Sequence, residues 1–146
     1  MSSIHSDIGA VTIAVNALAA LIGALAALAN RNPRAFWIVL RIGQGLVMAE
    51  AVIGAALLLA GKDLPRLHLI YGLTPIAVAF VAEQLRLATT PTLLEKRGLE
   101  GGKDVAKLPE AEQHALVAAI LRREIAVMAT SAGVVALLCM RAQGVL

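Results

Sequence analysis

The chain has 146 residues, of which 59% are hydrophobic and only 16% are charged, and its mean hydropathy is +0.79. This composition excludes an ordinary soluble domain, which at this size needs a more polar surface. The formal net charge is +3, but only 3% of the residues are aromatic and no basic run is interleaved with aromatics, so the sequence does not indicate nucleic-acid binding.

Four long apolar segments organise the chain. Each reaches the roughly 20 residues needed to cross the hydrocarbon core of a bilayer. A lone span in lipid satisfies its backbone only as a helix, so we expect an all-α integral membrane protein, a single domain over residues 1–146 that forms a four-transmembrane-helix bundle. The predicted helices cover residues 8–29, 36–60, 64–87 and 115–140.

The first segment carries no charge between Ile8 and Ala29. It is not expected to be a cleaved signal peptide, because "MSSIHSD" lacks Lys and Arg and the apolar stretch is longer than a signal requires. Small or weakly polar residues recur on it at steps of three and four, which predicts a helix-packing face. These residues are Gly9, Thr12, Asn16, Ala20, Gly23, Ala27 and Asn30.

The second segment holds a carboxylate, Glu50, in the middle of "RIGQGLVMAEAVIGAALLLAG". An acidic residue at a helix centre costs roughly 2.5–3.5 kcal/mol on insertion scales, so it needs a compensating environment. Helical spacing places Glu50 on a glycine-rich face, which predicts that it points into the bundle. That face comprises Gly43, Val47, Glu50, Gly54 and Gly61.

The third segment carries His68, Tyr71 and Glu83 on one broad face. It runs antiparallel to the second segment, so counting from the turn between them gives relative depths. Tyr71 comes within direct reach of Glu50, and His68 lies three residues further out and needs a water or a tilt. Arg41 and Glu83 share a depth at the opposite end and are expected to form an intramembrane ion pair.

Residues 88–114 form the only sizeable predicted loop. Gly101 and Gly102 break any helix there, whereas "LPEAEQ" has the features of a helix start, with Pro109 near the first turn. The fourth segment follows and carries only one charged cluster, at residues 122–124. Cys139, the single cysteine, excludes an internal disulfide and a cysteine metal site.

The distribution of basic residues predicts the orientation in the membrane. Ten Lys and Arg lie in or near the first and third loops, and three lie near the second loop and the C-terminus. The positive-inside rule therefore places residues 88–114 in the cytoplasm and both termini outside a cell inner (plasma) membrane.

Glu50 has two interpretations. As a structural group, it is a neutral carboxyl that hydrogen-bonds a neighbouring helix. As a functional group, it is a site for proton or cation movement, or one wall of a ligand pocket. Glu50, Tyr71 and His68 are therefore the candidate ligand- or proton-binding residues.

A haem site is a further possibility for His68. Two axial histidines are needed for a bis-histidine haem, and His5 is the only candidate partner on that side, because His114 lies on the other. No cluster has the spacing of a metal site, so no metal is predicted, and the cofactor is left open.

The segments "LHLIYGLTP" and "RREIAVMATSAGVVALL" resemble short four-helix integral membrane proteins of unassigned function from GC-rich bacteria. The resemblance covers most of the chain and implies location and architecture, with no catalytic residue.

Three functions are therefore expected, in order. The first is a non-enzymatic subunit or partner in a membrane assembly, either a homo-oligomer or a larger complex, because small-residue faces suit helix contacts and no complete catalytic constellation is present. The second is a small oligomeric transporter or channel that couples to protons or cations through Glu50. The third is a haem- or quinone-binding protein.

Overall fold

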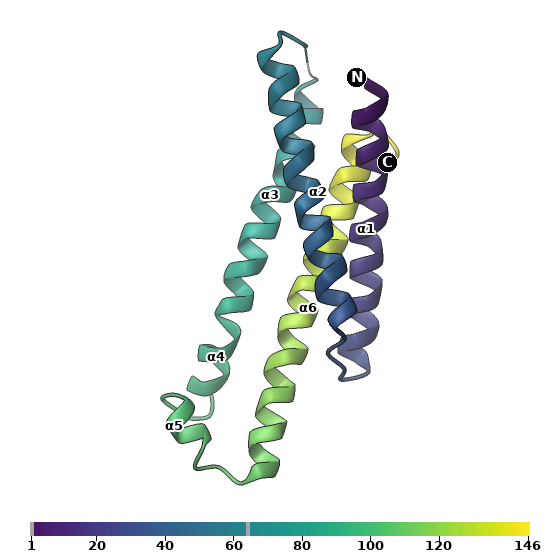
Figure 1. Cartoon of the computed structure of the whole chain (residues 1–146). Helices are drawn as coiled ribbons and strands as arrows, with labels where there is room; N and C mark the ends of the chain where they lie inside the picture. The colour runs from purple at the N-terminus through teal and green to yellow at the C-terminus, as the bar shows by residue number, and fades with distance from the viewer. Residues whose placement is uncertain (1, 64) are drawn as a thin grey trace.

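The computed structural model describes residues 2–63 and 65–146, of which the side chains are described from Ile4 onward. Within these ranges the chain is helical and contains no strand, which confirms the predicted all-α four-helix fold (Figure 1). The four long helices are α1 (Ser2–Leu28), α2 (Arg34–Leu59), α3 (Arg66–Leu87) and α6 (Glu110–Ala142).

Prolines and left-handed residues set the helix boundaries. Pro33, Pro65 and Pro109 directly precede α2, α3 and α6, where a missing N–H removes no intrahelical bond. Asn30 and Gly61 have positive φ angles of 51° and 75°, and they turn the chain after α1 and α2. Gly61 is therefore in the turn and not on the predicted face of the second helix. The expected start of the third helix at residue 64 lies outside the described residues.

Two predicted boundaries were wrong. The first helix begins six residues before residue 8, because the polar turn "SSIHSD" continues the helix beyond the apolar run. The predicted loop 88–114 contains two short helices, α4 (Thr89–Glu95) and α5 (Gly102–Val105), and the first turn of α6. Gly101 directly precedes α5 and Gly102 is its first residue, so the predicted helix break falls just before Gly102.

The four long helices run up and down, so both chain termini lie at one end (Figure 1). We call this the terminal end, and we call the opposite end, which holds residues 88–109, the loop end. Helix α6 packs against α1 and α3, and α2 packs mainly against α1. Helix α6 therefore contacts both α1 and α3 along the bundle.

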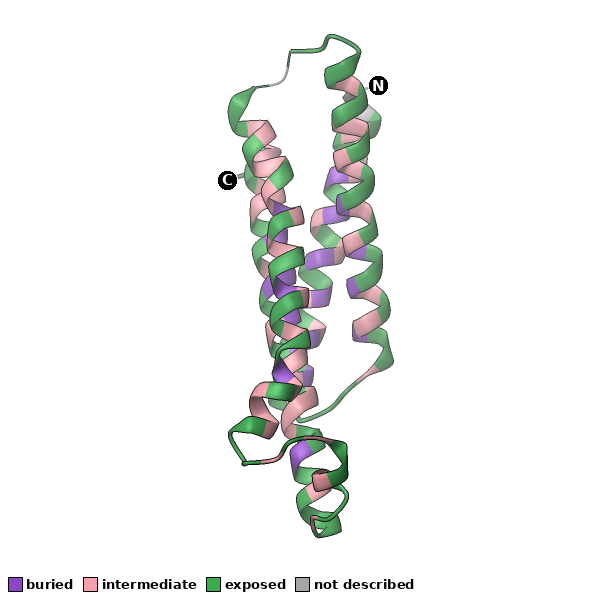
Figure 2. Ribbon diagram, turned by 90° about the vertical axis from the view of Figure 1, so that its left-hand side faces the viewer, coloured by how far each residue is buried: buried purple, intermediate pink, exposed green. Residues whose placement is uncertain are grey.

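All four long helices are long and apolar enough to cross a membrane. Their outward faces expose large apolar side chains, whereas the buried residues lie on the faces that meet (Figure 2). A water-soluble bundle would place charged residues on the outside. Exposed apolar side chains such as Leu59, Phe80 and Val52 are instead those that suit contact with lipid chains.

Small residues let α1 and α6 approach each other closely. Ala19 of α1 is fully buried, and Gly133 of α6 faces Ala20. A Cβ atom at Gly23 would lie 2.5 Å from the ring of Phe36 and 2.6 Å from Cβ of Ala129, so only glycine fits there. These contacts match the small-residue packing that drives helix association in lipid.

The predicted packing face of the first helix is buried in the structure. Thr12 and Asn16 are 1% and 2% exposed. The Asn16 amide donates to the carbonyl of Thr12 at 2.9 Å and to that of Gly43 in α2 at 3.5 Å. One end of the predicted stripe, Asn30, lies in the turn and is exposed.

Substitution of Gly23 by Ala tests this close packing. We expect Gly23→Ala to destabilise the bundle by about 1–3 kcal/mol, because the new methyl group overpacks against Phe36 and Ala129. The measurement is unfolding of the purified protein in mixed micelles. Gly45→Ala in α2 is the matched control, because a Cβ there meets nothing within 4 Å and Ala favours a helix. Equal stability of the two variants would contradict the proposed packing.

Candidate functional site

Charged side chains and histidines gather at the two ends of the bundle. At the terminal end they line two adjacent cavities, and at the loop end they form a network of ion pairs. Between these ends lies a core of fully buried residues, including Phe36, Ile125 and Met128.

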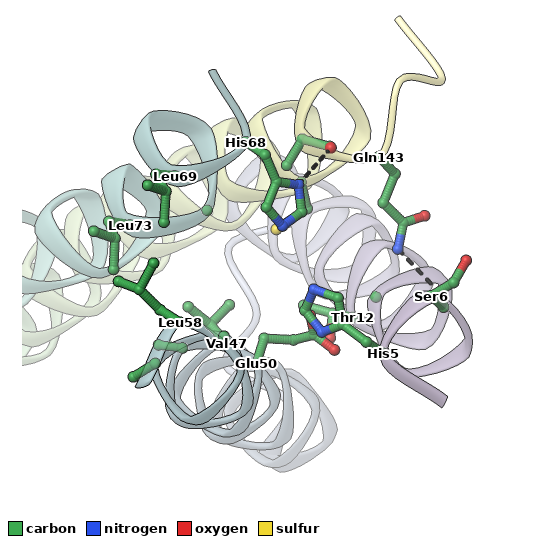
Figure 3. A pocket seen from close by; sticks show the side chains of 17 residues that line it. His5, Ser6, Thr12, Val47, Glu50, Leu58, His68, Leu69, Leu73 and Gln143 are labelled. Atoms are coloured by element: carbon green, nitrogen blue, oxygen red, sulfur yellow. Dashed lines mark hydrogen bonds and ion pairs between the residues drawn. The ribbon is translucent and has the colours of Figure 1, made fainter. Parts of the chain in front are cut away.

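The first cavity has a volume of about 380 Å³ and is bounded by all four long helices (Figure 3). Its walls are mainly apolar and small, and its polar groups are contributed by α1, α2, α3 and α6. The residues that line this cavity include His5, Glu50, Gly54, His68, Gly72 and Gln143.

Glu50 meets a histidine from the first helix. Its Oε2 lies 2.9 Å from Nδ1 of His5, and the two side chains are only 19% and 20% exposed. The contact is close but is not aligned as a hydrogen bond, and among the described residues Glu50 Oε1 is buried without a partner. Glu50 therefore points inward, as predicted, and its main neighbour is His5.

His68 is held by the end of the last helix. Its Nδ1 lies 3.0 Å from the carbonyl oxygen of Ala142. A carbonyl only accepts, so Nδ1 carries the proton and donates it, which leaves the Nε2 lone pair of His68 free.

The two imidazole rings face each other across the site. Their centroids are 5.7 Å apart and the ring planes meet at 72°. His68 Nδ1 is hydrogen-bonded to the Ala142 carbonyl, whereas His5 Nδ1 lies near Glu50 Oε2 without an aligned hydrogen bond (Figure 3). Anchoring of one nitrogen by a carboxylate or a backbone carbonyl is typical of histidines whose other nitrogen binds a metal.

Tyr71 does not reach Glu50, contrary to the depth estimate. Its ring lies beneath the Arg141 guanidinium, 5.8 Å from the ring centroid, and it lines a second cavity of about 490 Å³. The estimate assumed that α2 and α3 pack directly on each other. In the structure α3 packs mainly on α6, so Tyr71 turns toward the C-terminal end of that helix.

From the sequence, His5 is expected to precede the first helix and is a candidate only as a partner for His68. In the structure it lies inside α1 and on the same stripe as Gly9, Thr12 and Asn16, at helical steps of three and four. Extension of the small-residue stripe by one helical step, from Gly9 back to His5, would have predicted that His5 lies at the site. Gln143, which donates to the Ser6 carbonyl at 3.1 Å, carries no comparable signal in the sequence.

Arg41 and Glu83 form an ion pair at the loop end, between α2 and α3. Glu83 also accepts from Arg86 Nε at 2.9 Å and from Gln44 Nε2 at 3.3 Å. Arg86 in turn lies 3.8 Å from Glu124 in α6. Glu83 therefore pairs with two guanidinium groups, those of Arg41 in α2 and Arg86 in α3, and Arg86 connects them to α6.

The residues described in the structure include no group of three or more His, Cys, Asp or Glu side chains that could hold a metal ion. Cys139 lines the first cavity but supplies no such cluster.

The comparisons give no relative to this chain. No family model, no curated protein and no solved structure matches it. The resemblance to four-helix membrane proteins of GC-rich bacteria stays an expectation, and function has to be argued from the site alone.

Removal of the Glu83 charge tests the network at the loop end. We expect Glu83→Gln to lower the free energy of unfolding by about 1–3 kcal/mol, because hydrogen bonds to charged groups are lost and Arg41 is left without its partner. Denaturant titration in mixed micelles measures it. Glu95→Gln, on the exposed surface of α4, is the control and should be neutral; a similar loss in both would mean that the network does not stabilise the bundle.

Proposed function

We propose that this chain is a haem-binding membrane protein in which His5 and His68 are the two axial ligands of the iron. The observation that carries the proposal is the pair of neighbouring imidazoles, in which His68 Nδ1 is hydrogen-bonded to the Ala142 carbonyl and His5 Nδ1 lies 2.9 Å from Glu50 Oε2. Anchoring of this kind fixes the tautomer and the ring orientation before the metal arrives.

The separation of the rings fits one metal between them. Two imidazole ligands on opposite sides of a metal, each with a metal–nitrogen distance of about 2 Å, have ring centroids roughly 6 Å apart. The observed 5.7 Å needs only a small outward movement of His5 or His68. A structural zinc ion needs four ligands and a catalytic one three, whereas a haem iron takes only its axial ligands from the protein.

The walls also favour a flat, apolar cofactor. Gly54 and Gly72 contribute no side chain to the first cavity, and Ala51 and Ala55 contribute only methyl groups. A quinone is the weaker fit, because its two carbonyl groups accept hydrogen bonds at opposite ends of a ring. The two imidazole rings instead lie side by side, with centroids 5.7 Å apart, which suits two nitrogen ligands of one metal.

The arrangement supports electron transfer. When bound, a haem iron changes oxidation state by one electron, and two histidine ligands leave no open position on it for a substrate. An electron carrier needs a donor and an acceptor, so this proposal also favours a partner role in a larger membrane assembly. That role is the first function expected from the sequence, and it is not enzymatic.

A second candidate is the proton- or cation-coupled carrier that uses Glu50. It is favoured by the unpartnered Oε1 atom of Glu50 beside the first cavity. Against it stands the apolar core between the cavity and the loop end, where Phe36 and Ile125 are fully buried. An oligomer would be needed to provide a pathway across the membrane.

The proposed location is the inner (plasma) membrane, with the terminal end outside. The excess of basic residues at the loop end supports this orientation. The haem would then lie in the outer half of the bilayer, on the side of a donor or acceptor outside the cytoplasm.

Haem binding tests the main proposal. Purified protein titrated with hemin should give the Soret band and the low-spin ferric EPR signal of a bis-histidine haem. His5→Ala and His68→Ala should each abolish the low-spin signal, because each removes one of two axial ligands.

His114→Ala is the matched control, because this histidine is exposed at the loop end and far from the cavities. It should leave both signals unchanged. A wild-type protein without a Soret shift, or a low-spin signal that survives in both His5→Ala and His68→Ala, would refute the haem site. In that case flux in proteoliposomes with Glu50→Gln addresses the second candidate.

Thiol labelling of intact cells tests the orientation. In a Cys139→Ala background, Asp63→Cys at the terminal end should react with a membrane-impermeant reagent, and Glu100→Cys at the loop end should not. Each variant removes one exposed carboxylate, so the two are matched in charge. The reverse labelling pattern would place the site on the cytoplasmic side.

A further inference from the structure

The second cavity adjoins the first and shares the two histidines. Both cavities are lined by His5, His68, Ala142 and Gln143. The facing imidazoles therefore lie between two open spaces. A disc held between these rings extends in both directions, with one edge in the first cavity and the opposite edge in the second.

The two cavities differ in chemistry. The first is walled mainly by alanine, glycine and leucine, whereas the second contains a guanidinium group, that of Arg141, stacked over Tyr71. Leucines line the second cavity too, so its distinguishing feature is this one cation. An arginine that lines such a cavity is suited to bind a planar anion, such as a carboxylate, through two parallel hydrogen bonds.

Arg141 has donors to spare. Its Nη1 donates to the backbone oxygen of Leu146, the last residue of the sequence, and over residues 4–63 and 65–146 it forms no ion pair with an Asp or Glu side chain. A guanidinium has five N–H donors. The cation–π contact with Tyr71, 5.8 Å from the guanidinium carbon to the ring centroid, restrains the position of the group beside the cavity.

We infer that Arg141, positioned by Tyr71, binds a carboxylate of the cofactor in the second cavity and so sets which edge of the disc faces outward. This inference rests on the proposed haem site, since haem carries two propionate carboxylates on one edge. The apolar edge then lies among Gly54, Gly72 and Leu73, which offer no charged partner to a carboxylate. A phosphate of a lipid headgroup offers Arg141 the same kind of oxygen, so the experiment has to separate the two.

The experiment compares two cofactors with and without the arginine. Wild type, Arg141→Gln and Arg66→Gln are titrated in a phosphate-free, uncharged detergent with hemin and with its dimethyl ester, in which both propionates are neutral. We expect Arg141→Gln to weaken hemin binding about 10-fold or more, because a charge-assisted contact worth about 1.5–3 kcal/mol is lost. Binding of the ester should be the same in all three proteins.

Arg66→Gln is the control, because Arg66 is exposed at the terminal end but does not line either cavity. It should bind hemin as wild type does. Arg141→Lys, which keeps the charge and loses the fork, should be intermediate and serves as the test variant if Arg141→Gln does not fold.

Three results would overturn the inference. Hemin affinity that is unchanged in Arg141→Gln, or lowered equally for the ester, would remove the carboxylate contact while leaving the histidine ligands in place. An effect of Arg141→Gln that requires added anionic lipid would assign Arg141 to a lipid phosphate. Absence of hemin binding in wild type would overturn the proposed function, and this inference with it.

Discussion

The close approach of α1 and α6 is the constraint on which the rest of the structure depends. Lipid chains are as apolar as leucine, so burial of apolar surface does not drive helices together within a bilayer, and packing has to supply the attraction. Gly23 leaves room for Phe36 and Ala129, and Ala19 is fully buried at the same interface. Helix α6 also packs on α3. The relative positions of α1, α6 and α3 therefore depend on an interface that contains small residues such as Gly23 and Gly133.

This packing also assembles the site. The two helices are antiparallel, so their contact brings the beginning of α1 beside the end of α6. His5 and Ala142, which are 137 positions apart in the chain, thereby become neighbours of His68. No single helix contains the site, and a shift of α1 against α6 would separate the imidazole of His5 from that of His68.

The polar groups at the two ends of the bundle differ in how completely they are paired. At the loop end, Glu83 satisfies Arg41 and Arg86, and the charges compensate one another. At the terminal end, Glu50 keeps a buried oxygen atom without a partner among the described residues, and Arg141 faces a cavity. Groups that remain unsatisfied inside a membrane protein are unfavourable for stability, which is why they are associated with binding. This contrast is the reason for proposing a site at the terminal end.

The sequence by itself determined the four spans, the inward direction of Glu50 and the shared depth of Arg41 and Glu83. These features follow from helix length, periodicity and rise, which are properties of one helix or of two helices joined by a short turn. Which helices pack together was decided only by the tertiary structure. The contacts of His5 with Glu50, of His68 with the Ala142 carbonyl, and of Arg141 with Tyr71 all cross between helices, and their geometry depends on how small residues let α6 fit between α1 and α3. Periodicity gives the face of a side chain but not the neighbour that face will meet, so Tyr71 was expected beside Glu50 and lies instead against the end of α6.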